Sequence, residues 1–401
     1  MLDVISSPEE RQVDAAPTSV GGLTVRVIES DGIAEALSIW RKLEFRLRNQ
    51  SVTNSATWVE NWLAVYGVLQ QHQFLVAESR GVTRGICLIV RGVGQKVGPC
   101  PVRTIHLGTA GEAQPGSVCV EFNRILAENA VHEEFVARIV QHLQTLRGWD
   151  QIRLDGFSER DLSQWISYFP GAEIRSRESR YFDFVPVRQS GQKVIDALGK
   201  STRANLRRRL RQYGVLDCEW ANRLDQAEEI FSELIDLHQA RWTAVGQPGA
   251  FASERFRRFQ TRAVLKLYLE EKAVLFRVRH QGETVGCLLL LVDQNRLLDY
   301  LSGFADFNHK PSPGLVTHYL CMEEALRRNF AAYDFLVGEK RHKENLSNAS
   351  GQLCWLTWSR PTMKMKVISA IRSLKQRLLK QSGKGVESPP SSESTTPTET
   401  H

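Results

Sequence analysis

The chain of 401 residues lacks the cysteine pattern of a disulfide framework or a zinc site. Its seven cysteines are irregularly spaced, odd in number and include no Cys-x-x-Cys pair. Disulfide-stapled domains carry cysteines in even numbers, and structural zinc sites need closely spaced ligand pairs. We therefore expect reduced thiols and no metal.

Long apolar runs are also missing. No stretch approaches the roughly 18 apolar residues that a membrane-spanning helix requires. The first residues, Met1 to Ser19, are mixed and acidic, unlike a secretory leader with a basic start and an apolar centre. We expect a cytoplasmic protein.

Several catalytic signatures are absent as well. The sequence has no Gly-x-Ser-x-Gly elbow, no phosphate loop ending in Gly-Lys-Ser/Thr and no His-Glu-x-x-His pair. Gly92-Val-Gly94 lacks the third glycine of a dinucleotide fingerprint. These absences disfavour serine hydrolases, P-loop nucleotide hydrolases and zinc peptidases.

The length exceeds the size at which a single hydrophobic core stops growing, so two domains are expected. With 42% hydrophobic and 24% charged residues the composition is that of a soluble globular protein. An order of strand, two helices, three strands, helix and strand begins at Leu23 and recurs after a crossing segment at Tyr181 to Val187, which predicts an internal duplication. The predicted parts are a flexible N-terminus (1–21), an N-terminal domain (22–187), a C-terminal domain (188–362), a basic amphipathic helix (363–380) and a disordered tail (381–401).

The junction Ser312-Pro313-Gly314 stands directly before a helical run and is the most informative local feature. Pro313 stiffens the approach, and Gly314 permits a backbone conformation that other residues avoid. The first free N–H groups of the helix can then face an anion such as a phosphate. The alternative is that the tripeptide is only a turn opening a helix.

Specific motifs carry a family resemblance. They are Tyr300-Leu-Ser-Gly-Phe, Ser312-Pro-Gly, Tyr333-Asp-Phe-Leu-Val-Gly338-Glu339, His342-Lys343, and an Arg-rich helix over Ser201 to Gly214. Together they resemble the CelD/BcsL-like acetyltransferases of the GNAT superfamily. The resemblance extends over about 23–361 and is clearer in the second half.

This resemblance implies an α/β (α+β) fold of two tandem GNAT-like domains, each a mixed, mostly antiparallel sheet flanked by helices, and a relation to the FemABX transferases. It implies acetyl-CoA or another acyl-CoA as donor and an amine or hydroxyl of a sugar or cell-envelope acceptor, with an association to exopolysaccharide synthesis. The pantetheine arm would follow a splayed strand over 297–303. The implied donor-binding residues are Ser302, Gly303, Ser312, Pro313, Gly314, Leu315 and Val316.

A base must take the proton of the acceptor, and a carboxylate at a strand end beside the donor is a suitable candidate. Glu339 is the first choice and Asp334 the second. For Asp334 the alternative is a structural carboxylate that caps a neighbouring loop.

Candidate substrate-binding residues are cationic or aromatic. Arg203, Arg207 and Arg211 recur at every fourth position of one helical face. They suit the 3′-phosphate of CoA, a lipid-linked phosphosugar or a tRNA backbone, or they form only a solvated basic face. Lys343 could hold a phosphate or carboxylate or be merely solvated. The remaining candidates are His309 and His342, the latter at a position where the family has Tyr.

The final helix, Met363 to Lys380, carries six basic residues and no acidic one. An apolar stripe of Val367, Ile371, Leu374 and Leu378 gives it the character of a membrane-surface anchor. The alternative is that this stripe packs against the C-terminal domain.

Two other functions stay open. The same fold could use aminoacyl-tRNA as donor, as the FemABX relatives do, which would make a nucleic acid its partner. Alternatively, the chain could be a catalytically inactive scaffold of polysaccharide synthesis.

Overall fold

A computed structural model describes residues 22–47, 51–92, 95–97, 100–113, 115–306, 311–338 and 341–381. The candidate residues Glu339 and His309 lie outside these ranges, as do the predicted flexible N-terminus and all of the predicted tail except Gln381.

The first half of the chain forms a unit of strands and helices in the predicted order. Alternating or continuous apolar runs produce its strands, and 3.6-residue periodicity produces its helices. Its main elements are β1 (Thr24–Glu29), α1 (Ile33–Leu47), α2 (Ala56–Val65), β2 (His72–Ser79), β3 (Val82–Arg91), β6 (Thr104–Leu107), α3 (His132–Thr145) and β8 (Gln151–Ser158). Smaller elements are β4 (Gln95–Val97), β5 (Cys100–Val102), β7 (Leu126–Ala127) and α4 (Glu159–Ile166).

The second half repeats this order. Its elements are β10 (Asp217–Trp220), α8 (Leu224–Ala244), α9 (Glu254–Leu269), β11 (Ala273–His280), β12 (Glu283–Asp293), β13 (Arg296–Phe304), α10 (Pro313–Arg327) and β14 (Ala332–Val337). In the first unit β6 pairs in parallel with β8, and in the second unit β13 pairs in parallel with β14. The predicted duplication is therefore present in the fold.

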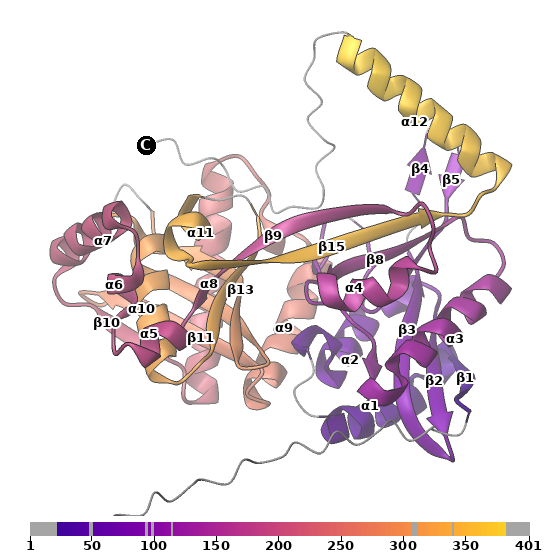
Figure 1. The fold of residues 1–401 in the computed structure, drawn as a ribbon. Coiled ribbons are helices and arrows are strands. Elements are labelled where there is room, and N and C mark those ends of the chain that lie inside the picture. The colour runs from indigo at the N-terminus through magenta and orange to yellow at the C-terminus, as the bar shows by residue number, and fades with distance from the viewer. Residues whose placement is uncertain are drawn as a thin grey trace, which may run out of the picture.

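Two long strands join the units. Within the described residues, thirteen strands form one sheet whose main path runs β1-β2-β3-β6-β8-β15-β9-β14-β13-β12-β11-β10. β9 (Glu173–Asp183) follows the first unit in sequence but pairs with β14, whereas β15 (Ala349–Ser359) follows the second unit but pairs with β8. Figure 1 shows β9 and β15 running side by side between the two groups of helices. β9 thus completes the second unit and β15 completes the first, so each strand pairs with a unit on the other side of the predicted boundary at 187/188.

Helices cover both faces of this sheet. On one face α1 and α2 meet α8 and α9 in a core shared by both units, where Trp58 and Phe259 pack edge to face with ring centroids 4.9 Å apart. On the other face α3 and α4 cover the first unit. The second unit is covered there by α10 with three helices of the connecting segment, α5 (Val185–Gln189), α6 (Val194–Ala197) and α7 (Lys200–Tyr213). The predicted mixed, mostly antiparallel α/β fold is confirmed.

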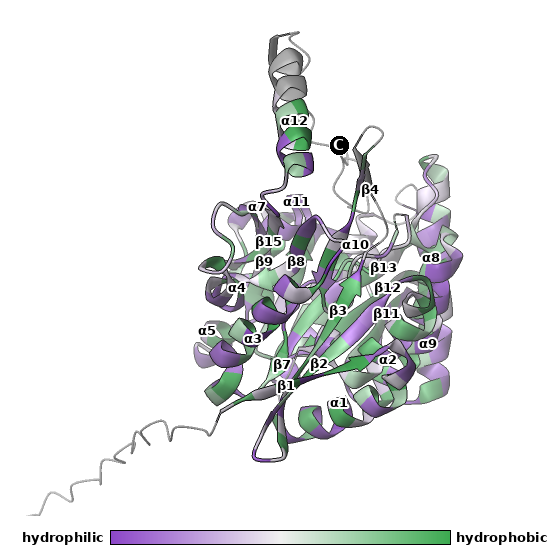
Figure 2. Ribbon diagram, turned by 90° about the vertical axis from the view of Figure 1, so that its right-hand side faces the viewer, coloured by the Kyte–Doolittle hydropathy of each residue, from purple (hydrophilic) through white to green (hydrophobic). Residues whose placement is uncertain are grey.

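The last helix, α12 (Met363–Gln381), stands away from the sheet (Figure 2). It is attached through Met365 and Ile368, which pack on Val102 of the first unit. Val367 and Ile371 are 53% and 56% exposed, so these two members of the predicted stripe do not pack against the C-terminal domain. The side chains of Leu374 and Leu378 lie outside the described residues.

All seven cysteines are free thiols. Over the described part of the chain, no helix is long and apolar enough to cross a membrane. The same residues contain no group of three or more His, Cys, Asp and Glu side chains that could hold a metal ion.

Candidate active site

The parallel strands β13 and β14 separate soon after they begin. Their described pairing comprises Arg296 with Ala332, Leu297 with Tyr333 and Leu298 with Asp334. Beyond this point β13 contains a bulge, because Leu290 and Leu289 of β12 face Asp299 and Leu301 and leave Tyr300 unmatched. A bulge bends a strand locally, and β13 continues to pair with β12 beyond it. Among the described residues, β13 and β14 share no pairs after Leu298 and Asp334, so the two strands separate there.

Asp334 lies on β14, on the other side of the gap that opens where β13 and β14 separate. It is fully buried, and its oxygens accept hydrogen bonds from the Ser179 hydroxyl (2.7 Å), the Leu336 N–H (2.8 Å) and the Arg296 guanidinium (2.7 Å). Leu336 has a φ of +59°, a left-handed conformation that costs free energy for a bulky side chain. The carboxylate holds this strained turn, which favours the structural interpretation of Asp334 over its role as base.

Lys343 lies on the short helix α11 (Arg341–Leu346) and holds the same turn. Its side chain is buried, and its Nζ donates to the carbonyl oxygens of Leu336 (3.1 Å) and Val337 (2.8 Å). The alternative that Lys343 is merely solvated does not hold, because the Leu336 and Val337 carbonyls replace water around the ammonium group. Its binding of a phosphate or carboxylate stays a prediction. Gly338 beside it has a φ of +142°, a backbone conformation that residues with a side chain rarely adopt.

The N-terminus of α10 begins at Pro313, as predicted, but Gly314 does not have the special backbone conformation expected of it. The left-handed residue is Ser312, with φ 52° and ψ 53°. Gly314 contributes in a different way, because a Cβ would lie 3.3 Å from the ring of Phe304 at the end of β13 and that ring would have to shift slightly. The small residue lets α10 approach the strand closely.

Other predicted donor residues have structural partners. Val316 is fully buried, and its N–H donates to the Ser312 carbonyl (3.3 Å). A Cβ on Gly303 would come within 2.5 Å of the Leu234 carbonyl, so α8 packs directly on that part of β13. The Ser302 carbonyl lies 3.0 Å from Nδ1 of His238 on the same helix. The Leu315 side chain packs on the second unit's core.

His342 lies beside the gap in an aromatic cluster. Its ring stacks on His318 of α10, with centroids 5.7 Å apart and planes 8° from parallel. Nδ1 of His318 lies 2.9 Å from the Tyr333 hydroxyl, and Nε2 lies 3.8 Å from a carboxylate oxygen of Asp299 on β13. Burial raises the pKa of Tyr333 well above its ordinary value. This cluster brings β13, β14, α10 and α11 together.

The predicted arginine face lies on α7, which packs beside α10. Arg207 is exposed and forms a 3.4 Å ion pair with Asp196, and Arg203 donates to the Asp196 carbonyl at 3.3 Å. Arg211 is exposed, while Leu206 on the opposite face is fully buried. The basic face therefore lies next to the helix whose N-terminus was predicted to bind phosphate.

Sequence reasoning missed one carboxylate at the gap. Glu121 belongs to the first unit, yet its Oε2 accepts the N–H of Val337 at 3.0 Å, beyond the point where β14 leaves β13. The side chain is half-buried. Burial raises its pKa to about 7, against the opposing effects of the Val337 N–H and the Lys343 ammonium. No motif marks Glu121, because a contact across some 200 residues leaves no local signal.

The first unit has an equivalent gap, but its own chain fills it. β6 and β8 pair at three positions, after which Asn123 lies between them. The Asn123 N–H donates to the Gly156 carbonyl (3.0 Å) and its side-chain amide to the Leu107 carbonyl (2.9 Å). The second unit is therefore the better candidate for a binding site.

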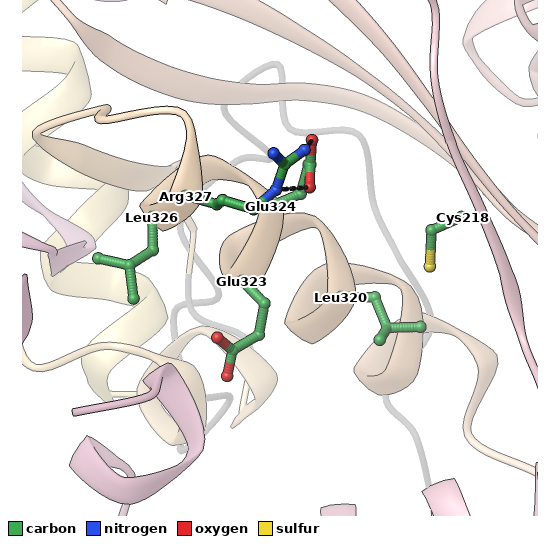
Figure 3. A pocket seen from close by; sticks show the side chains of 6 residues that line it. All are labelled: Cys218, Leu320, Glu323, Glu324, Leu326 and Arg327. Atoms are coloured by element: carbon green, nitrogen blue, oxygen red, sulfur yellow. Dashed lines mark hydrogen bonds and ion pairs between the residues drawn. The ribbon is translucent and has the colours of Figure 1, made fainter. Parts of the chain in front are cut away.

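An open hollow of about 420 Å³ lies farther along α10 (Figure 3). It is lined by Cys218, Leu320, Glu323, Glu324, Leu326 and Arg327. Arg327 is held by Glu324 at 2.8 Å, so the lining presents net negative charge and is unsuited to a polyphosphate.

Comparisons with known proteins identify a family similarity in the second unit. The family description "Acetyltransferase (GNAT) domain" matches residues 200–344, a range that includes α7, β13, α10, β14 and most of α11. None of the curated proteins matches the sequence significantly.

Solved structures resemble almost the whole chain at low sequence identity. The crystal structure of FemX has a TM-score of 0.52 and 9% identity and covers 89% of this chain and 99% of its own. The C-terminal domain (DUF2156) of a protein from Agrobacterium fabrum named as a lysylphosphatidylglycerol synthetase has a TM-score of 0.52 and 12% identity, covering 86% and 97%. A conserved Bacteroides thetaiotaomicron protein of unknown function has a TM-score of 0.51 and 10% identity, covering 84% and 100%. The chain therefore shares the fold of these structures, and its residues 200–344 match the description of the GNAT acetyltransferase domain.

Proposed function

We propose that the protein is an acyl-CoA-dependent acyltransferase whose donor binds to the second unit. The observation that carries this proposal is the separation of β13 from β14 within the matched GNAT domain, directly before the N-terminus of α10. A thioester is already activated, so such an enzyme mainly has to orient an acceptor and stabilise an oxyanion.

The roles of the chain's own groups follow from their positions. Main-chain N–H groups beside the β13 bulge would stabilise the oxyanion, because they are fixed before the reaction begins. The N–H groups of Gly314 and Leu315 precede the first repeating hydrogen bond of α10 and would face the pyrophosphate of CoA. Arg207 and Arg211 on the neighbouring α7 would bind its 3′-phosphate.

The acceptor we propose is an amine or hydroxyl of a sugar or cell-envelope molecule, consistent with the resemblance to CelD/BcsL-like proteins. Acetyl is the proposed acyl group and the cytoplasm the proposed location. The exposed Val367 and Ile371 on the basic α12 support contact with an anionic membrane surface, where lipid-linked acceptors are found.

Calorimetry with acetyl-CoA tests the donor site through Ser312→Asp. Asp tolerates the left-handed conformation of this position and favours a helix N-terminus, so the variant should fold. Its charge should repel the pyrophosphate by about 1.4–2.8 kcal/mol, which weakens binding about ten- to hundredfold. Ser253→Asp at the N-cap of α9 is the matched control, and it should bind like the wild type.

The rival donors give different results in the same experiments. Aminoacyl-tRNA as donor predicts RNA binding that falls steeply with salt and with Arg207→Ala, and no binding of acetyl-CoA. A scaffold predicts that neither ligand binds. Failure of the wild type to bind any acyl-CoA contradicts the proposed function.

A further inference from the structure

One loop of the first unit connects the two sides of the gap in the second. The Val118 carbonyl accepts the Tyr300 hydroxyl at 3.1 Å, and Tyr300 is the bulged residue of β13. Three residues later, Glu121 accepts the N–H of Val337 on β14. The segment 118–121 therefore contacts a side chain of β13 through Val118 and the main chain of β14 through the Glu121 carboxylate.

The backbone of this loop is held in a costly conformation. Cys119 and Phe122, on either side of the Val120-Glu121 pair, have φ values of 48° and 55°. Each residue other than glycine in the left-handed conformation costs about 1 kcal/mol or more, so contacts with the surrounding structure must hold the loop in place. Asn123 supplies part of this restraint by bonding to Gly156 and Leu107 in the gap of the first unit.

Gly156 on β8 makes room for this loop. A Cβ at this position would lie 2.3 Å from the Val120 carbonyl oxygen and 3.1 Å from Cα of Glu121. A glycine with φ +69° lets the loop pass against the strand. The gap between β6 and β8 of the first unit is thus occupied by the segment that carries Glu121.

The surroundings of Glu121 suit a group that exchanges protons. Among the described residues, the charged groups that most influence it are Lys343 on α11, Asp334 on β14 and Arg177 on β9. Lys343 and Asp334 are engaged with the β14 turn, and Glu121 is half-buried with its Oε2 bonded to the Val337 N–H.

We propose that Glu121 is the general base that takes the proton from the acceptor, a role that rests on the proposed acyltransferase function. The acceptor nitrogen or oxygen attacks the thioester carbonyl carbon while its proton passes to a Glu121 carboxylate oxygen. The tetrahedral oxyanion then collapses, the C–S bond breaks, and the sulfur leaves with the electron pair and takes a proton from water. Glu121 finally releases its proton to solvent, so the acyl group has exchanged places with one proton.

The test uses Glu121→Gln in the full-length chain. The amide can still accept the Val337 N–H but cannot take a proton. Release of CoA from acetyl-CoA is measured with amino sugars, amino acids and neutral sugars as acceptors, and pH profiles are recorded with the acceptor that the wild type uses. Glu112→Gln is the matched control, because Glu112 is a buried carboxylate of the same loop region that bonds to the Val118 N–H at 2.8 Å. Glu339→Gln tests the residue that the sequence favours.

We expect Glu121→Gln to bind acetyl-CoA like the wild type and to lower kcat by at least about 100-fold. The wild-type kcat/KM should rise with pH through a step near 7, and this step should be absent in the residual activity of the variant. Glu112→Gln should keep both the rate and the step.

Four results would overturn the assignment of Glu121 while leaving the transferase intact. They are an unchanged rate, an unchanged pH step, loss of acetyl-CoA binding in Glu121→Gln, and loss of the step in Glu339→Gln alone. Absence of acyl-CoA binding in the wild type would instead overturn the proposed function, and this inference with it.

A second measurement does not depend on finding an acceptor. Carbon-13 spectra of protein labelled at its glutamate carboxyls should contain one resonance that titrates near pH 7 and is missing in Glu121→Gln. Adding acetyl-CoA should raise the midpoint of this resonance, because the donor displaces water and brings negative charge. A midpoint near 4.5, or one that acetyl-CoA does not move, would refute the proposal.

Discussion

Replacing Asp334 separates the two roles that this residue could have. If Asp334 holds the β14 turn, Asp334→Ala should destabilise the protein strongly, while Asp334→Asn should destabilise it less and keep part of the activity. If Asp334 were the base, Asp334→Asn should abolish turnover at nearly unchanged stability.

The size of the effect follows from the three donors around the carboxylate. Asp334→Ala leaves the buried Ser179 hydroxyl and the Leu336 N–H without an acceptor, at about 1–3 kcal/mol each. Arg296 is 31% exposed and lies 4.5 Å from the centre of the Tyr181 ring, so it can regain water at little cost. We expect a total loss of about 4 kcal/mol for Ala, and about 1–2 kcal/mol for Asn, which still offers one oxygen.

Urea unfolding followed by tryptophan fluorescence measures these losses. The midpoint should fall in the order wild type, Asp334→Asn, Asp334→Ala, and an unchanged m-value would show that the same surface is exposed on unfolding. A loss below about 1 kcal/mol for Asp334→Ala would refute the reasoning, since a buried carboxylate with three donors cannot be removed so cheaply.

Three further predictions concern the loop and the last helix. Gly156→Ala should lower the urea midpoint far more than Gly171→Ala, because both glycines are left-handed but only the first would place a Cβ 2.3 Å from a carbonyl oxygen; equal losses would contradict this. Stability should fall as pH rises from about 4.5 to 7, because native Glu121, with a pKa of about 7, keeps its proton after the unfolded chain has lost it. Glu121→Gln should remove this part of the decline in the urea midpoint, and an identical decline in the variant would contradict it. Val367→Asp with Ile371→Asp should weaken sedimentation with anionic lipid vesicles but not alter binding of acetyl-CoA, and unchanged sedimentation would exclude this surface.

The fold was readable from the sequence where the signals are local. Apolar runs such as Gly286 to Leu291 predict buried strands, and the helix after Ser312 begins where Pro313 indicates. The exchange of β9 and β15 was not readable, because strand pairing across most of the chain depends on tertiary packing rather than on local pattern.

The site was readable only in part for the same reason. Ser312, Pro313 and Lys343 could be found from a motif, but the left-handed conformation of Ser312 and the burial of Lys343 follow from contacts with other elements. Glu121 reaches Val337 from a loop that Gly156 and Asn123 help to hold in the gap of the first unit. None of these relations has a fixed spacing along the chain.

Because β9 and β15 are exchanged between the units, the sheet cannot be completed until late in synthesis on the ribosome. The outer edge of β8 stays without its partner until β15 has been made, roughly 200 residues later, and at about 5–20 residues per second this wait lasts about 10–40 s. During that time the nascent N-terminal half carries an open, apolar strand edge that invites misassembly with other chains. A polypeptide interrupted before Ala349 would leave both halves of the molecule incomplete.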